Sequence, residues 1–142
     1  MKIAAHIARI LLGLMFTMSG LTVFVALVFP FNMPEAPPGL ASDFTHVFFT
    51  SHWVYFVDAV QALSGILLLV NRYVPLALTI LAGIIYNILA FHITIEPNGL
   101  PVAIVTAVLW FLAYSQYRES FAPLLAAKPA TTPTAPAEAH VN

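Results

Sequence analysis

The sequence contains no cysteine among its 142 residues. Disulfide bonds, thiolate nucleophiles, and zinc or iron–sulfur sites held by cysteine are therefore excluded. Charge is also scarce, because Asp, Glu, Lys and Arg together make up only 8% of the chain, about a third of the share in soluble proteins. Five Lys and Arg against six Asp and Glu give a net charge of −1, so the chain has no basic surface that would attract nucleic acid.

What the sequence has in abundance is apolar residues. Hydrophobic side chains account for 61% of the residues, and the mean hydropathy is +0.91. A soluble domain of this size has too much surface for its volume to bury so many apolar side chains. The composition therefore excludes a soluble globular domain and predicts an all-α integral membrane protein whose main partner is the lipid bilayer.

Four apolar segments are long enough to cross the hydrocarbon core of a bilayer. The first carries no charge from Ile10 to Pro34 and exceeds the apolar region of a cleaved signal peptide, so we expect a retained helix. Short connections at Asn71-Arg72-Tyr73 and Glu96-Pro97-Asn98-Gly99 separate the later segments, and the second is rich in turn-forming residues. The predicted spans are about 5–29, 51–70, 74–95 and 100–117.

Short connections make consecutive membrane helices antiparallel neighbours. We therefore predict a four-transmembrane-helix antiparallel bundle over residues 1–125, with a long first loop on the outer side. In that loop, Phe44 and Val47 to Phe49 are typical of a short segment that lies in the membrane interface. Residues 126–142 are rich in Ala, Pro and Thr, which predicts a disordered cytoplasmic tail.

The basic residues determine the predicted orientation. With four spans, all five Lys and Arg fall on one side of the membrane, and the carboxylates Glu35, Asp43 and Glu96 fall on the other. Basic residues accumulate on the cytoplasmic side of membrane proteins. We therefore expect a multi-pass protein of the plasma membrane with both termini and the Arg72 turn in the cytoplasm.

Small residues form a stripe on each of two predicted spans. These residues are Gly13, Thr17 and Gly20 in the first span, and Thr79, Gly83, Asn87 and Ala90 in the third. Small side chains allow helix backbones to approach closely in lipid. Packing inside the bundle explains both stripes, and a dimerisation face is the alternative.

Four polar side chains at membrane depth are the candidate site residues: Asp58, Gln61, Asn87 and His92. The short turn at Arg72 brings the second and third spans alongside each other, so Asn87 falls level with Asp58 and His92 lies further out. Polar groups in a membrane are costly unless paired, and they usually face the bundle interior or water. We expect Asp58 and His92 to share one polar site that binds a ligand or transfers protons. The simpler interpretation is hydrogen bonding that only joins the helices.

The sequence contains no nucleophile elbow, phosphate-binding loop, zinc-protease motif or metal-ligand spacing. A freestanding hydrolase or transferase is therefore not supported, no metal site is predicted, and whether the chain is an enzyme is left open. A small-solute or proton pathway through the whole membrane is disfavoured, because the chain between Arg9 and Thr17 is almost wholly apolar.

The segment Val57–Tyr73 resembles the second helix of the DoxX-like family, in which an acidic residue, three spacers, a glycine, an apolar run and a basic turn follow one another. Arg9–Gly13, Ser19-Gly20, Phe91-His92 and Tyr117–Phe121 also fit this family. The resemblance covers about residues 5–125. It implies a four-helix plasma-membrane protein of bacteria or archaea, and some members are linked to quinone-coupled redox complexes, including thiosulfate oxidation.

One position departs from the family pattern. Gln61 stands where the family has Glu, four residues before Gly65, so Asp58 is the nearby carboxylate that remains. The resemblance implies an accessory subunit of a membrane redox system, with quinone as the candidate cofactor and other redox subunits as partners. The alternatives are a non-catalytic packing or partner-binding module and, third, a small-solute or proton pathway.

Overall fold

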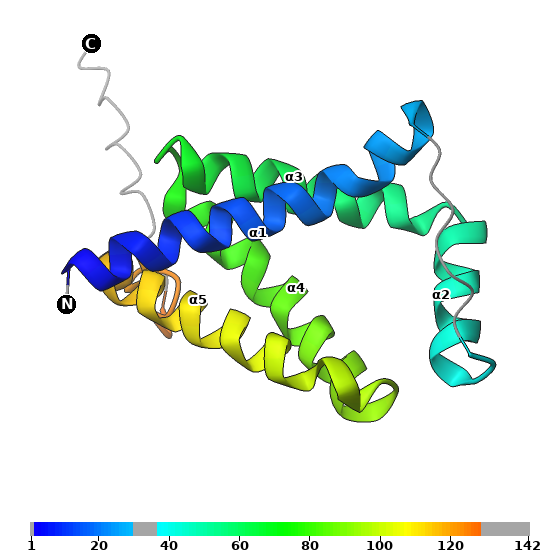
Figure 1. Ribbon diagram of the computed structural model, residues 1–142. Helices are drawn as coiled ribbons and strands as arrows, with labels where there is room; N and C mark the ends of the chain where they lie inside the picture. The colour runs from blue at the N-terminus through cyan, green and yellow to red at the C-terminus, as the bar shows by residue number, and fades with distance from the viewer. Residues whose placement is uncertain (1, 30–36, 129–142) are drawn as a thin grey trace, which may run out of the picture.

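The computed structural model describes residues 2–29 and 37–128, and within these ranges every regular element is helical (Figure 1). The elements are α1 (Lys2–Val28), α2 (Leu40–Thr50), α3 (Trp53–Leu69), α4 (Val74–Thr94), the short 3-10 helix η1 (Pro97–Gly99) and α5 (Leu100–Phe121). Three helices, α1, α4 and α5 with η1, are each long and apolar enough to cross a membrane. Helices α2 and α3 form a fourth candidate that is bent by 85°. These helices indicate a membrane protein.

The helices follow the predicted spans, with differences at their ends. Helix α1 begins at Lys2, and α5 continues to Phe121, one turn beyond the predicted end. Within the predicted span 51–70, α3 has 17 residues, or about 25 Å of helix at 1.5 Å per residue, which is close to the minimum for a crossing. The first loop contains α2. Residues 30–36 of that loop, and the predicted tail from 129 onward, lie outside the described residues.

Residues suited to turns mark the helix ends. Between α3 and α4, Asn71 and Tyr73 adopt left-handed backbone angles, with φ of 56° and 51°, which reverses the chain within a few residues. Proline lies in the first turn of both following helices, at Pro75 in α4 and at Pro101 in α5. There its missing N–H removes no helical hydrogen bond.

Helix α1 packs most extensively against α3, and the two lie side by side in Figure 1. Glycine is required at the crossing, because a Cβ on Gly20 would overlap the backbone of Asp58 and Ala62, and one on Gly65 would overlap Thr17. The first small-residue stripe therefore packs inside the molecule. On α4, by contrast, a Cβ on Gly83 would meet nothing within 4 Å.

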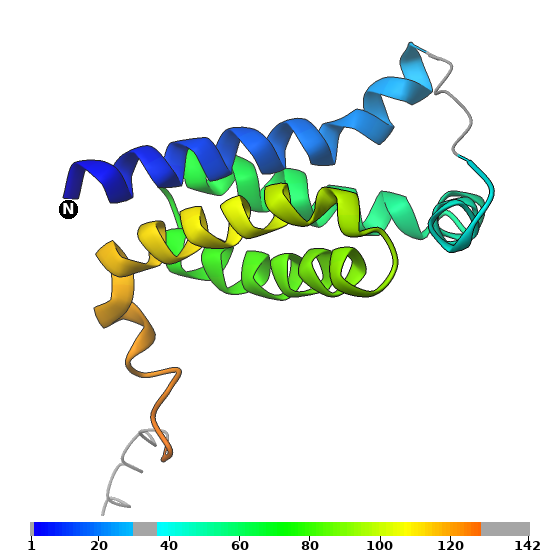
Figure 2. The ribbon, with the colours of Figure 1, turned by 60° about the horizontal axis from the view of Figure 1, so that its bottom comes forward.

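The four long helices contact one another in a ring, since α1 packs against α3 and α5, and α4 packs against the same two. Leu12, Leu68, Leu78 and Leu81 are completely buried between them. Trp110 Nε1 on α5 donates a hydrogen bond of 2.8 Å to the Leu78 carbonyl oxygen on α4. Viewed in Figure 2, α2 is seen along its axis while the long helices are seen from the side, so α2 runs across their direction.

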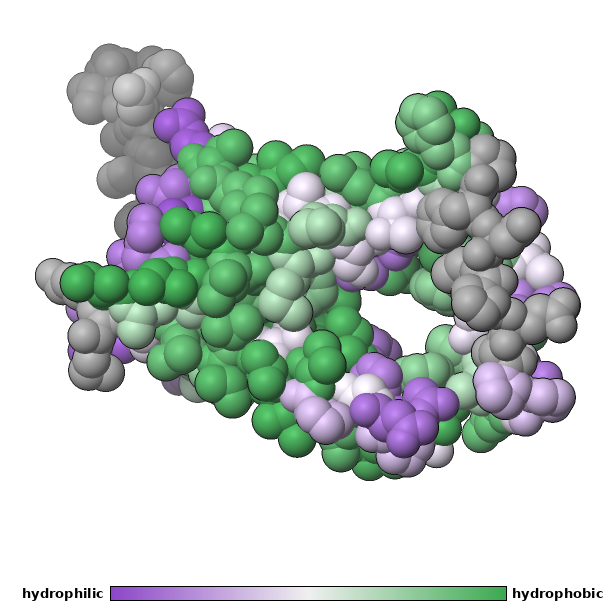
Figure 3. Space-filling model, in the orientation of Figure 1, coloured by the Kyte–Doolittle hydropathy of each residue, from purple (hydrophilic) through white to green (hydrophobic). Residues whose placement is uncertain are grey.

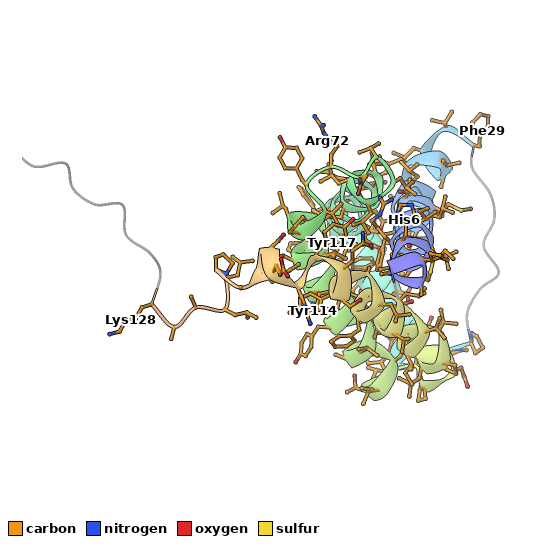
Figure 4. The ribbon with its side chains drawn as sticks, turned by 90° about the vertical axis from the view of Figure 1, so that its left-hand side faces the viewer. His6, Phe29, Arg72, Tyr114, Tyr117 and Lys128 are labelled. Carbon is orange, nitrogen blue, oxygen red and sulfur yellow. The ribbon has the colours of Figure 1, made fainter. Side chains whose placement is uncertain are left out.

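The basic residues gather at one end of the helices. Figure 4 shows His6, Arg72 and Tyr117 at this end, where α1 begins, α3 turns into α4 and α5 finishes. Arg9 is buried there, and its Nη1 donates to the Leu68 carbonyl oxygen at the end of α3. Tyr117 Oη donates to Asn71 Oδ1 at 3.2 Å and joins α5 to the turn.

Apolar residues cover most of the face shown in Figure 3, and hydrophilic residues gather mainly toward the two ends of the helices. Many large apolar side chains of the molecule are exposed, including Met18, Phe56, Tyr86 and Phe111. In water such a surface would drive aggregation, whereas in a bilayer the lipid chains would contact it directly. The surface therefore agrees with a molecule that contacts a bilayer.

Candidate functional site

A cavity of about 650 Å³ lies between α2, α3 and α4. Figure 3 shows the opening between α2 and the rest of the molecule. Most of the wall is apolar and comes from all three helices, with Phe44 and Phe48 on α2, Val57 on α3, and Ile88 and Phe91 on α4. Four polar residues interrupt this apolar wall: Ser51, Gln61, Asn87 and His92.

The sharp bend between α2 and α3 creates this cavity. His52 adopts a left-handed backbone conformation with φ of 63°, which turns the chain directly before α3. The Phe44 ring on α2 then packs against the Phe91 ring on α4, with 5.1 Å between their centroids. Because α2 is held at the bend and at this aromatic contact, it bridges the ends of α3 and α4 and encloses the space between them.

Asp58 and Gln61 are both buried and are hydrogen-bonded to each other. Gln61 Nε2 donates to Asp58 Oδ1 at 3.2 Å, and Ser19 Oγ on α1 donates to Gln61 Oε1 at 3.4 Å. Gln61 borders the cavity, whereas Asp58 does not. The carboxylate is thus linked to the cavity wall through the Gln61 amide.

His92 is held in the last turn of α4 by contacts with the turn that follows. Its Nδ1 donates to the Glu96 carbonyl oxygen at 2.8 Å, because a carbonyl oxygen can only accept. The ring also lies against Gly99, where any Cβ would overlap it. The packing fixes the ring, which borders the cavity.

Asn87 also borders the cavity, one turn and a half before His92 on α4. Its Nδ2 donates to the Gly83 carbonyl oxygen at 2.8 Å, within the same helix. Among the described residues, Asn87 Oδ1 has no hydrogen-bond partner. One hydrogen-bond acceptor of this side chain is therefore free for a ligand.

The structure places three of the four predicted site residues, Gln61, Asn87 and His92, on one cavity wall. Within the described ranges, no hydrogen bond joins Asp58 to Asn87 or His92, and Asp58 is bonded to Gln61 instead. A site shared by Asp58 and His92 therefore stays a prediction. Sequence reasoning assigned Phe44 and its neighbours to the membrane interface and missed their contribution to the cavity. Their aromatic spacing was the available signal, but it does not reveal which way α2 turns.

An apolar cavity with a few convergent polar groups is the usual form of a small-molecule site, and such sites have volumes of about 300–1,000 Å³. This cavity offers apolar contacts for a ring or chain and hydrogen bonds for a compact polar end. In the described part of the chain, no three His, Asp or Glu side chains lie close enough to hold a metal ion. The arrangement suits the binding of an apolar molecule that carries a small polar group.

Comparisons with protein-family models, with curated proteins and with solved structures find no match to this chain. The resemblance to the DoxX-like family is therefore an expectation from the sequence motifs alone.

Proposed function

We propose that this chain is a DoxX-like protein of the plasma membrane, in which α1, α3, α4 and α5 form an antiparallel bundle of four spans with both termini in the cytoplasm. The ring of contacts among these helices supports the bundle. The basic residues support the orientation, because Arg9, Arg72 and Arg118 belong to segments at the same end of the helices. Basic residues at one end indicate the cytoplasmic side.

Within this framework, we propose that the protein binds a quinone-type molecule and serves as an accessory subunit of a membrane redox system. The observation that carries this proposal is the cavity of about 650 Å³, which joins an apolar wall to three polar side chains at membrane depth. A quinone has a flat ring with small polar groups and an apolar tail. The chemical character of the cavity wall suits both parts.

The residues of this chain would bind and orient such a molecule. The remaining amide N–H groups of Asn87 and Gln61 would donate to its carbonyl oxygens, and His92 Nε2 would accept from a hydroxyl group of its reduced form. The aromatic side chains Phe44 and Phe91 would contact its ring or tail. The quinone itself supplies two-electron redox chemistry when bound. The electrons would come from or go to a partner subunit, in keeping with an accessory role.

The direct test is purification of the full chain in mild detergent, followed by identification of co-purifying quinone and proteins. We expect quinone to co-purify with the natural protein. Val57→Phe, which fills the cavity, should remove it, whereas the matched control Val108→Phe on the exposed surface of α5 should not. No quinone with the natural protein, or equal amounts with both variants, would contradict the proposal.

A second candidate function is binding of a partner membrane helix through α4, without chemistry. The observation in its favour is the second small-residue stripe, where Thr79, Gly83 and Asn87 are exposed. Because the chain lacks cysteine, Gly83→Cys would introduce a single thiol for cross-linking in membranes. A cross-linked product that forms with Gly83→Cys but not with the reference variant Val108→Cys would support this candidate. No cross-linked product with Gly83→Cys would count against it.

A further inference from the structure

The three helices that enclose the cavity contain carboxylates but no Lys or Arg. Their two carboxylates are Asp43 on α2 and Asp58 on α3. The chain has no basic residue between Arg9 and Arg72, or between Arg72 and Arg118. Figure 2 shows α2 at the end of the long helices that lies away from the start of α1, whereas the basic residues gather near that start. A positively charged ligand in the cavity would therefore meet no Lys or Arg of the surrounding helices.

Asp58 is the carboxylate that the orientation of the chain does not explain, because it lies within α3 and is buried. Only 8% of its surface is exposed, and its Oδ1 accepts a hydrogen bond of 3.2 Å from Gln61 Nε2. Within residues 2–29 and 37–128, no Lys or Arg pairs with it. A buried carboxylate is costly unless a positive charge or hydrogen bonds compensate it. Because Gln61 borders the cavity, a cation there would lie one amide group away from Asp58.

The aromatic side chains of the cavity wall provide ring faces for a cation. Phe44, Phe48, Trp53 and Phe91 all border the cavity. The centroid of the Phe44 ring lies 5.1 Å from that of Phe91 and 6.1 Å from that of Phe48, so these three rings form one aromatic surface across α2 and α4. Trp53 carries the ring type that attracts cations best, and 61% of its surface is exposed. This attraction needs no hydrogen bond, because it depends on the negative face of the ring.

We propose that this cavity binds lipophilic organic cations, which are ammonium or phosphonium ions whose charge is surrounded by aryl or alkyl groups. The apolar wall contacts these groups, the aromatic rings attract the charge, and Asp58 compensates it across weakly screened surroundings. A quaternary cation neither donates nor accepts a hydrogen bond, so its recognition does not depend on which polar atoms of the wall are free. The proposal uses the same cavity as the proposed quinone site but needs no quinone, so it goes beyond the proposed function.

The test compares tetraphenylphosphonium with tetraphenylborate, two ions of nearly the same size and shape but opposite charge. Binding of each ion to the full chain in phosphatidylcholine nanodiscs is measured by equilibrium dialysis. Empty nanodiscs are the reference, because both ions also partition into lipid. The measurement is made at about pH 8, where ordinary carboxyl groups are ionised and ordinary imidazoles are neutral. We expect saturable binding of the phosphonium, and binding of the borate weaker by about tenfold or more, because only the phosphonium is attracted by Asp58 and the ring faces.

Asp58→Asn tests the buried charge. It keeps the shape of the side chain and an oxygen that can accept from Gln61 Nε2, but it removes the negative charge. We expect this variant to bind the phosphonium severalfold more weakly. The matched control is Glu119→Gln, which removes an exposed carboxylate in the last turn of α5, far along the chain from the cavity helices, and should leave binding unchanged.

Trp53→Leu tests the ring faces. Because Trp53 is largely exposed, the fold tolerates this change, and the variant gives a result even if Asp58→Asn does not fold. We expect it to bind the phosphonium severalfold more weakly. Trp53→Phe should restore most of the affinity, because a phenyl ring keeps a face for the cation.

Selective binding of the phosphonium that each folded variant at Asp58 and Trp53→Leu weakens, but Glu119→Gln does not, would support the proposal. No saturable binding of the phosphonium, or equal or tighter binding of the borate, would overturn it. Unchanged affinity in a folded Asp58→Asn or Trp53→Leu protein, or an equal loss in Glu119→Gln, would also overturn it. Co-purification of quinone is a separate measurement, so the proposed function stands or fails independently of these results.

Discussion

Arg9 is a charged residue that is buried at the end of the bundle, with 3% of its surface exposed. Its guanidinium donates to the Leu68 carbonyl oxygen near the end of α3, where the helix dipole favours a cation. Its Nη2 also approaches His6 Nδ1 at 3.5 Å. This side chain therefore ties the start of α1 to the end of α3.

We expect Arg9→Met to lower the free energy of unfolding by about 2 kcal/mol, the usual value for a hydrogen bond to a charged group. The measurement is unfolding of the purified protein in detergent, followed by circular dichroism. Arg118→Met is the matched control, because it removes the same charge from an exposed position in the last turn of α5. Equal losses in the two variants would show that the charge matters and the buried contact does not.

At the residue scale, three of the four residues singled out from the sequence border the cavity, whereas their hydrogen bonds could not be foreseen. The short turn at Arg72 fixes the register of α3 against α4, and polarity at membrane depth selects Gln61, Asn87 and His92, which share the cavity wall. Most of their partners are local, because Asp58 bonds Gln61 three residues on and His92 bonds the Glu96 carbonyl four residues on, whereas Gln61 also bonds Ser19 on α1. Such local bonds compete with bonds between helices, and a sequence pattern does not decide between them.

At the scale of elements, the crossing of α1 and α3 depends on glycine. A methyl group on Gly20 would overlap the α3 backbone, which cannot move aside as a flexible side chain can. We expect Gly20→Ala to separate the two helices and to lower the free energy of unfolding by about 2 kcal/mol or more, the range for overpacking. Thermal unfolding in detergent measures this change.

Gly83→Ala is the control for this prediction, because it makes the same change in another helix where the added methyl group meets no neighbour. We expect it to keep or slightly raise the unfolding temperature, since alanine favours a helix more than glycine does. If Gly20→Ala were as stable as Gly83→Ala, the close packing of α1 on α3 would be wrong.

The elements differ in how far the sequence predicts them. Helices α1, α4 and α5 could be located because a membrane span must match the bilayer thickness, and this length constraint is visible as an apolar run. Helix α2 has only 11 residues and no such constraint. Its direction follows from the left-handed conformation of His52 and from the contact of Phe44 with Phe91, neither of which leaves a periodic pattern in the sequence.

At the scale of the whole molecule, the proposed orientation makes a prediction about the two sides of the membrane. A reporter that works only in the cytoplasm should be active when it is fused after Lys128, because the basic residues lie at the end where α1 begins and α5 finishes. A reporter inserted in the first loop, after Gly39, should give the opposite result. Cleavage of the C-terminal tail by protease added to intact cells would contradict this topology.

The central claim is that the cavity between α2, α3 and α4 binds a quinone-type molecule, and the two tryptophans of the chain allow a direct test. Trp53 borders the cavity, whereas Trp110 lies on α5 with its indole N–H bonded to the Leu78 carbonyl oxygen. Decylbenzoquinone is titrated into nanodiscs that hold either Trp110→Phe or Trp53→Phe protein, and the remaining tryptophan fluorescence is measured. We predict saturable quenching of Trp53, lost in the added presence of Val57→Phe, and only weak, linear quenching of Trp110. Equal, non-saturable quenching of both tryptophans would contradict the claim.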